Sequence, residues 1–236
     1  MKTFKKRLFG FFRFTVKTLK LMGLILLISC KNETIGDFKT WKVYGGDSSG
    51  SKYSNLSQIN TANAKQLKLL WEREIYDKEE IHKDGIQCNP IIIKNRMFVI
   101  GPDMKVHSIN AADGNLNWSF DPFPEKKYSG NSRGVTYFDD RKNGRLFFVA
   151  ASFIYCIDAI TGKAISSFGT DGKVSLKKGF EEKAEQLFIT ASTPGIVYEN
   201  LLILGSRVLD GANQKTMPGN IRAFNVYSGA IEWEFH

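Results

Sequence analysis

The sequence contains few cysteines, prolines and histidines: its 236 residues include three, six and three of them, respectively. So few cysteines exclude a disulfide-stabilised scaffold, and so few prolines exclude a collagen-like or proline-rich disordered chain. Hydrophobic residues make up 42% of the chain and aromatic residues 13%. A chain of this length and composition folds into one or two ordinary globular domains with a real core.

Acidic residues are missing from the first 29 positions, which hold seven basic residues: Lys2, Lys5, Lys6, Arg7, Arg13, Lys17 and Lys20. This stretch accounts for most of the formal net charge of +9, because only 26 of the 33 basic residues remain to face the 24 acidic ones. The rest of the chain is therefore almost neutral. This excludes the nucleic-acid-binding function that the charge of the whole chain would suggest.

Long apolar runs are missing as well, because the apolar stretch that follows the basic region, residues 21–29, is only nine residues long. Nine residues cannot span a bilayer as a helix, but a short apolar run after a positive region is typical of a secretory signal. The run ends in Leu27-Ile28-Ser29-Cys30, which resembles the bacterial lipobox. In that motif the peptide is cut directly before the cysteine, whose thiol carries a diacylglycerol.

We therefore expect residues 1–29 to be a lipoprotein signal peptide, Cys30 to be the lipidated first residue, and residues 30–40 to be a linker. This predicts an exported bacterial lipoprotein, anchored to a membrane on the periplasmic side. The alternative is an uncleaved membrane anchor with an incidental cysteine, which the polar residues 31–39 fit equally well. Both interpretations put the globular part outside the cytoplasm.

Two cysteines, Cys88 and Cys156, then remain in the folded part. They could pair in an oxidising compartment, although their spacing does not indicate it. Each lies in an apolar segment, where cysteine behaves as a small hydrophobic residue. We expect two buried thiols.

A repeated pattern organises the rest of the chain: a short strand, Asn or Asp, polar residues with a glycine, and a second strand. It occurs at residues 106–118, 154–163 and 221–233. The pattern predicts a β-hairpin, because glycine takes the positive φ of the turn and the carboxylate or amide caps the turn backbone. A tryptophan follows the glycine by four residues in the first and third units, as Trp118 and Trp233, whereas the second unit has Ser166 there.

The spacing of these turns predicts a β-propeller. The glycines Gly114, Gly162 and Gly229 are 48 and 67 residues apart, with short apolar runs between them. A period of about 40 to 50 residues with several strands per unit is typical of propeller blades. We therefore expect an all-β fold of four-stranded antiparallel blades, in which residues 41–236 form about four blades. The one helical stretch, residues 180–186, is expected to be an insertion on one face of the ring.

The repeat, with Asp-x-x-Thr-Gly and a closing tryptophan, resembles the blade of the pyrroloquinoline quinone (PQQ)-dependent dehydrogenases, where the indole docks between blades. Further motifs of the family's glucose and alcohol dehydrogenases follow in order along the chain. They are Trp41-x-x-Tyr44-Gly45-Gly46-Asp47, the segment 52–60, Arg133-Gly134-Val135, and the segments 194–198, 205–208 and 218–224. Together they cover nearly all of the chain from Trp41 to His236.

The resemblance implies a ring of eight blades around PQQ and a Ca²⁺ or Mg²⁺ ion, in an enzyme that oxidises sugars or alcohols in the periplasm. At about four blades, this chain resembles the N-terminal half of such an enzyme. The family's catalytic base lies in the second half and has no counterpart before His236. We therefore expect the chain alone to be inactive, and its exposed end blades to self-associate or to pair with a missing C-terminal half.

The resemblance also implies cofactor-binding residues. Arg133 lies where the family places a guanidinium against the PQQ carboxylates, and Gln87 matches a carboxylate or amide that contacts the quinone. Ser192, Thr193 and Ser206 lie on segments that supply hydroxyls to PQQ. Without the motif, Arg133 would be interpreted as a surface arginine and Gln87 as an ordinary strand residue.

Asp210 is the candidate metal ligand, because hard divalent cations bind carboxylate oxygens and relatives carry an acidic ligand after Gly-Ser-x-Val. Some relatives have an asparagine next, where this chain has Gly211, so one ligand is missing. The alternative is a loop aspartate before a glycine turn. A single aspartate does not make a metal site.

The competing function is a non-catalytic propeller lipoprotein that scaffolds outer-membrane protein assembly. Such a protein has no reason to carry Arg133 in its Arg-Gly-Val setting or the segment 205–224. The substrate stays open among glucose, another aldose and a simple alcohol. No Cys-x-x-Cys-His motif for haem attachment occurs in the sequence.

Overall fold

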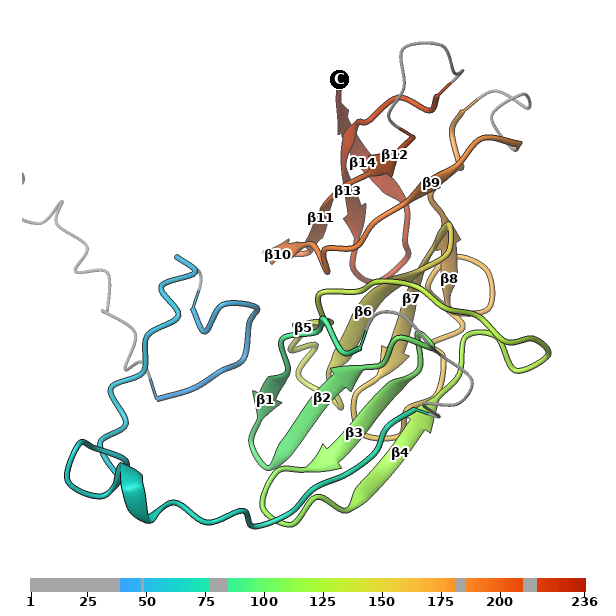
Figure 1. The fold of residues 1–236 in the computed structure, drawn as a ribbon. Helices are drawn as coiled ribbons and strands as arrows, with labels where there is room; N and C mark the ends of the chain where they lie inside the picture. Colours follow the sequence, from blue (N-terminus) through green and yellow to red (C-terminus); the bar gives the residue numbers. More distant parts are fainter. Residues whose placement is uncertain (1–38, 48, 77–84, 181–185, 210–215) are drawn as a thin grey trace, which may run out of the picture. The chain divides into compact units, whose positions relative to one another are not determined.

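The computed structural model describes residues 39–47, 49–76, 85–180, 186–209 and 216–236 (Figure 1). They belong to one compact unit, residues 38–236. The predicted signal peptide with Cys30, the candidate ligand Asp210, and all but the ends of the expected helix at 180–186 lie outside the described residues. No helix in the described ranges is long and apolar enough to cross a membrane.

The described residues form three four-stranded antiparallel sheets, each with its strands in sequence order (Figure 1). The first contains β1 (Ile91–Ile93), β2 (Arg96–Ile100), β3 (Val106–Asn110) and β4 (Leu116–Phe120). The second contains β5 (Thr136–Phe138), β6 (Arg145–Ala150), β7 (Phe153–Asp158) and β8 (Lys173–Ser175). The third contains β10 (Ile196–Tyr198), β11 (Leu201–Gly205), β13 (Ile221–Asn225) and β14 (Ile231–Phe235). The prediction of an all-β fold with four-stranded antiparallel blades is confirmed.

Two further features lie outside these sheets. The pair β9 (Ile189–Thr190) and β12 (Arg207–Val208) forms a two-stranded ladder within the third unit. Ahead of β1, a 3-10 turn spans Ala64–Gln66, and Trp41 forms an isolated bridge with Ile92. Residues 41–236 have the length of about four blades, but the described residues form three four-stranded sheets. The difference arises because residues 39–76 add no sheet of their own.

The three repeat turns have the predicted structure. Gly114, Gly162 and Gly229 have φ values of 75°, 70° and 70°. Each glycine N–H donates to the carbonyl four residues earlier, over 2.8–2.9 Å. The side-chain oxygens of Asn110 and Asp158 cap their turns by accepting backbone N–H groups two residues on.

At two of the turn glycines, the indole ring of a tryptophan from the preceding unit packs directly on the glycine. A Cβ added to Gly114 would lie 2.7 Å from the Trp71 ring, and one added to Gly162 would lie 2.5 Å from the Trp118 ring. The indole Nε1–H donates to Ala111 in the first case and to Ala159 in the second, both over 3.3 Å. Each acceptor lies three residues before its glycine. The predicted tryptophan docking between units is therefore confirmed at these two junctions.

At the third junction, residues other than tryptophan cover the turn glycine and donate the hydrogen bond. The fully buried ring of Phe168 lies 3.3 Å from the Cβ that Gly229 would carry. Val174 Cγ2 lies closer still, 2.4 Å from that Cβ. Arg145 Nη1 donates a hydrogen bond over 3.3 Å to the carbonyl of Val226, which lies three residues before this glycine. Val174 and Phe168 thus cover the glycine, and Arg145 supplies the donor. The sequence analysis identified Ser166 at the tryptophan position but did not find these replacements.

A second contact between units repeats on the third strand of each sheet, three residues before the turn Asn or Asp. There His107 donates a hydrogen bond to the Ile75 carbonyl, and Tyr155 Oη donates to the Pro122 carbonyl over 3.5 Å. Ile75 and Pro122 each lie four residues after a docking tryptophan. In the third sheet, Arg222 occupies this position and donates to the carbonyls of Leu176 and Lys178.

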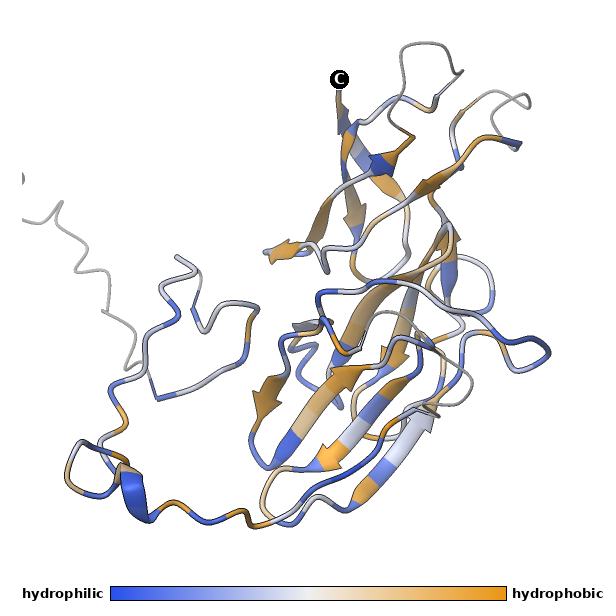
Figure 2. Ribbon diagram, in the orientation of Figure 1, coloured by the Kyte–Doolittle hydropathy of each residue, from blue (hydrophilic) through white to orange (hydrophobic). Residues whose placement is uncertain are grey.

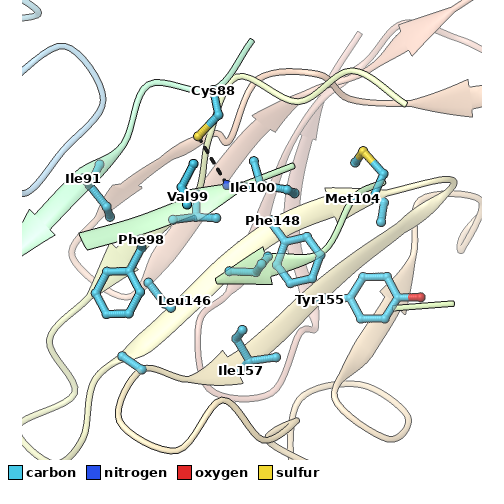
Figure 3. Packing of buried hydrophobic residues seen from close by; sticks show 14 of the residues in the cluster. Cys88, Ile91, Phe98, Val99, Ile100, Met104, Leu146, Phe148, Tyr155 and Ile157 are labelled. Atoms are coloured by element: carbon cyan, nitrogen blue, oxygen red, sulfur yellow. Dashed lines mark hydrogen bonds between the residues drawn. The ribbon is translucent and has the colours of Figure 1, made fainter. Parts of the chain in front are cut away.

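Two clusters of buried apolar residues join neighbouring sheets, and among the strands that supply them β2 and β6 are coloured largely as hydrophobic (Figure 2). The first cluster includes Cys88, whose Sγ accepts the Ile100 N–H over 3.5 Å (Figure 3). The second cluster includes Cys156. Both thiols are free and buried, and burial raises the pKa of Cys88 to about 11 and that of Cys156 to about 12. The prediction of two buried thiols is confirmed.

Candidate functional site

Three segments that run into the first strand of each sheet form the centre of the candidate site; we call residues 85–90, 131–135 and 191–195 the approach segments. Backbone hydrogen bonds join them in series. The Asn89 N–H donates to the Arg133 carbonyl over 3.1 Å, and the Arg133 N–H donates to the Ser192 carbonyl over 2.7 Å. Gln87, Arg133, Ser192 and Thr193 are far apart in sequence, and these bonds bring their segments side by side.

Arg133 lies in the middle segment with an exposed side chain. Its backbone is held by its neighbours, since the buried Ser132 Oγ bonds to both the N–H and the carbonyl of Gly134 over 3.3 and 3.2 Å. Gly134 has a φ of 141°, and an added Cβ would lie 3.0 Å from the Asn89 carbonyl. Glycine is therefore required here.

The guanidinium of Arg133 makes no hydrogen bond or ion pair within the part of the chain that the structure describes. It differs in this respect from Arg145, which pairs with Asp140 over 3.3 Å, and from Arg222, which donates to two carbonyls. An exposed guanidinium is a planar two-pronged donor that keeps its charge. Arg133 is therefore free to bind an anionic ligand.

Gln87 lies in the first approach segment, exposed and next to the buried Cys88. It borders a small hollow that Ser132 also lines, so the residue lies near the loop that carries Arg133. In the third segment, Ser192 is half-buried and Thr193 is exposed. Thr136 Oγ1 on β5 holds this segment in place, since it lies 2.9 Å from both the Pro194 and the Gly195 carbonyl oxygens.

Ser206 is placed near the third approach segment by the two-stranded ladder of β9 and β12. Arg207 pairs with Thr190, so Ser206 lies one residue beyond the last pair on β12, and Ala191 lies one residue beyond it on β9. The ladder therefore places Ser206 at the start of the third approach segment. Among the described residues, no group of three or more His, Cys, Asp or Glu side chains is arranged to hold a metal ion.

The donor set is one guanidinium, one amide and several hydroxyls, on backbone that its neighbours hold. Asn89 and Ser132 help to hold the site, and the sequence analysis did not find them, because their part depends on contacts between segments that are distant in the chain. A set that is rich in donors, with one free cation, suits a ligand that carries carboxylates and carbonyl oxygens. It contains no group placed to take a proton from a substrate.

The sequence is similar to proteins of known function. Residues 41–236 match the family model described as the β-propeller domain of the PQQ glucose/ethanol/alcohol dehydrogenases. Quinoprotein glucose dehydrogenase A of Acinetobacter calcoaceticus is 30% identical over 220 residues, which are 83% of this chain and 27% of that protein. The glycerol dehydrogenase large subunit of Gluconobacter oxydans is 28% identical over 210 residues, which are 82% of this chain and 28% of that protein.

The fold is found in solved structures as well. The quinohemoprotein alcohol dehydrogenase from Comamonas testosteroni superposes with a TM-score of 0.66 at 23% identity, covering 86% of this chain and 28% of that one. The chain thus spans about a quarter of the length of the curated relatives that it matches.

Proposed function

The chain belongs to the PQQ glucose, ethanol and alcohol dehydrogenase β-propeller family, and from this premise we propose that it forms part of the PQQ-binding ring of an enzyme that oxidises a sugar or an alcohol. The observation that carries the proposal is the free guanidinium of Arg133, whose backbone is hydrogen-bonded to the segments of Gln87 and Ser192. A scaffold protein has no use for such a cation. The relatives are dehydrogenases, so the scaffold alternative is not favoured.

PQQ fits the residues that are present, because it carries carboxylates and adjacent quinone carbonyls. Arg133 would bind a carboxylate through paired N–H donors. The Gln87 amide would donate to a carbonyl oxygen, and the hydroxyls of Ser192, Thr193 and Ser206 would complete the polar contacts. Ser132 and Gly134 keep the Arg133 backbone in place for this role. When bound, PQQ supplies the two-electron acceptor for oxidation of the substrate hydroxyl.

A divalent cation is the second proposed partner. Asp210 would contribute one carboxylate oxygen to Ca²⁺ or Mg²⁺, and both ions need several further oxygen ligands. Those ligands, the catalytic base and the remaining blades would come from protein beyond the residues described. Sugar or alcohol turnover then requires that further part, and this chain contributes cofactor binding.

The proposed location is the periplasmic side of a bacterial membrane, with the lipidated Cys30 as the anchor. The basic region and the short apolar run before Cys30 support export. A Cys30→Ser variant tests this proposal. It should stay uncleaved or be released from the membrane fraction, whereas a variant that is processed and still sediments with membranes would contradict lipidation.

Direct titration tests the cofactor proposal. We expect the full chain to bind PQQ and to quench tryptophan fluorescence as it does so, and Arg133→Ala to weaken binding at least tenfold, because it removes the charged donor pair. Gln87→Ala should weaken binding less, since a neutral hydrogen bond contributes about 1 kcal/mol. Lys163→Ala, which removes an exposed cation in a repeat turn, is the matched control. Equal PQQ affinity in Arg133→Ala and Lys163→Ala would contradict the assignment.

A further inference from the structure

The motif at residues 41–47 has no part in the proposed function so far, and the structure places it beside the approach segments. The Trp41 carbonyl accepts the Ile92 N–H over 2.7 Å, and the two residues form an antiparallel bridge. Ile92 lies on β1, the edge strand that the first approach segment enters. We call the described residues of 41–52 the entry loop; it starts at this edge.

The entry loop is compact, because its own contacts close it. The Gly46 N–H donates to the Val43 carbonyl over 3.0 Å, and the Lys52 N–H donates to the Gly45 carbonyl over 2.9 Å. Gly46 also packs on the first residue of the loop, since an added Cβ would lie 3.1 Å from the Trp41 ring. These contacts surround residue 44 in the sequence and fix where its side chain starts.

That side chain lies against the loop that carries Arg133. A Cβ added to Gly134 would lie 4.0 Å from Tyr44 Cδ2. The same point lies 3.0 Å from the carbonyl oxygen of Asn89, in the first approach segment. The entry loop and the first two approach segments therefore meet at Gly134, the residue that follows Arg133.

The hydroxyl of Tyr44 is available to a ligand. The side chain is 37% exposed, and its hydroxyl has no hydrogen-bond partner among the residues that the structure describes. Tyr155 differs, because it is buried and donates to the Pro122 carbonyl. Only the width of the ring separates a tyrosine hydroxyl from Cδ2, so this free donor lies near the loop of the free guanidinium.

We propose that Tyr44 is a further ligand-binding residue of the PQQ site, and that its hydroxyl donates a hydrogen bond to an anionic oxygen of the ligand bound by Arg133. The inference rests on the proposed function, because it needs that ligand. A hydrogen bond to an ionised acceptor is about twice as strong as one between neutral groups. Tyrosine supplies it at low cost in conformational entropy, since its side chain has only two rotatable angles.

Titration of the full chain with PQQ tests the proposal. Tyr44→Phe should weaken binding about tenfold, because it removes only the hydroxyl and keeps the ring against Gly134. Tyr227→Phe is the matched control, since the Tyr227 ring contacts Phe138 and Arg145 instead. This variant should bind PQQ as the unchanged chain does, and both variants should keep the thermal unfolding midpoint.

Labelling with 3-fluorotyrosine gives a direct readout, in which the ¹⁹F resonance of Tyr44 is the one missing from Tyr44→Phe. PQQ should shift this resonance in a saturable way. If the unchanged chain binds PQQ, an unshifted Tyr44 resonance or equal affinity in Tyr44→Phe and Tyr227→Phe would overturn the role of Tyr44 and leave the proposed function standing. No PQQ binding by the unchanged chain would overturn both.

Discussion

The junction between the first and second sheets and the junction between the second and third sheets meet the same requirements with different side chains. At the first, Trp118 covers Gly162 with its ring and donates to Ala159 with its indole N–H. At the second, Val174 and Phe168 cover Gly229, and Arg145 donates to the carbonyl of Val226. The comparison shows that the repeat preserves two interactions, an apolar cover and a hydrogen bond to the carbonyl three residues before the glycine. One residue provides both at the first junction, and three residues provide them at the second.

The largest effect is expected at the junction that depends on one residue. Trp118→Ala removes the cover and the donor together, so we expect the free energy of unfolding to fall by about 4 kcal/mol. Trp233→Ala is the matched control, because Trp233 is 41% exposed and covers no repeat glycine in the described structure. Urea denaturation of both variants measures the difference. An equal loss in the two would show that docking on Gly162 contributes nothing.

A smaller effect is expected from Arg145→Ala, which removes the hydrogen-bond donor of the second junction but leaves the apolar cover over Gly229 in place. Arg145 also pairs with Asp140, and both side chains are nearly buried, with 11% and 9% exposed. Loss of the arginine leaves that carboxylate without its partner, so we expect about 3 kcal/mol. The double variant Asp140→Asn with Arg145→Ala should recover part of the loss in the same denaturation experiment. No recovery would mean that the hydrogen bond to Val226 carries the whole effect.

The second repeated contact predicts a pH dependence. Burial, together with the charges of Lys105 and Arg73, lowers the pKa of His107 from 6.5 to about 4; Asp103 and Asp121 line the same pocket as His107. The unfolded chain therefore binds a proton first, and stability falls as the pH drops from about 6.5 to about 4, by at most about 3 kcal/mol. His107→Tyr should remove this part of the pH dependence. An identical pH profile in this variant would contradict it.

The smallest effect is expected from Phe168→Leu. Leucine keeps an apolar cover over Gly229, and Arg145 still donates to Val226, so we expect a loss of only about 1 kcal/mol. Phe168→Ala leaves a cavity and should cost more. Thermal unfolding of the two variants side by side measures the cover alone. A loss from Phe168→Leu as large as that from Trp118→Ala would show that the two functions are not divided at this junction.

Much of the fold was visible in the sequence, because the repeat turns use local chemistry. The turns can be predicted from Asn110, Asp158 and the turn glycines, because the hydrogen bonds that form each turn lie within five residues. The spacing of Trp71 and Trp118 can be recognised in the sequence as well. Phe168 and Arg145 were not predicted. Phe168 lies two residues past the tryptophan position, and Arg145 lies on another strand, so no spacing in the sequence connects them with Gly229.

The same division holds for the candidate site. The motifs identified Gln87, Arg133 and the segment of Ser192, and only the structure shows that their segments adjoin. Their roles toward PQQ stay predictions, as do Thr193 and Ser206. The place of Tyr44 beside Gly134 was not predicted, because it depends on a contact between segments that are distant in the chain.

By itself the sequence determined the repeat and the all-β architecture, since both follow from residue types at short, regular spacings. The family followed from the resemblance of its motifs to those of known proteins. Only the tertiary structure decided which groups are satisfied and which are free. The guanidinium of Arg145 is bound by Asp140 and Val226, whereas that of Arg133 has no partner in the described residues. Two arginines look alike in a sequence, and their chemistry differs because burial and partners are set by segments that meet only when the chain folds.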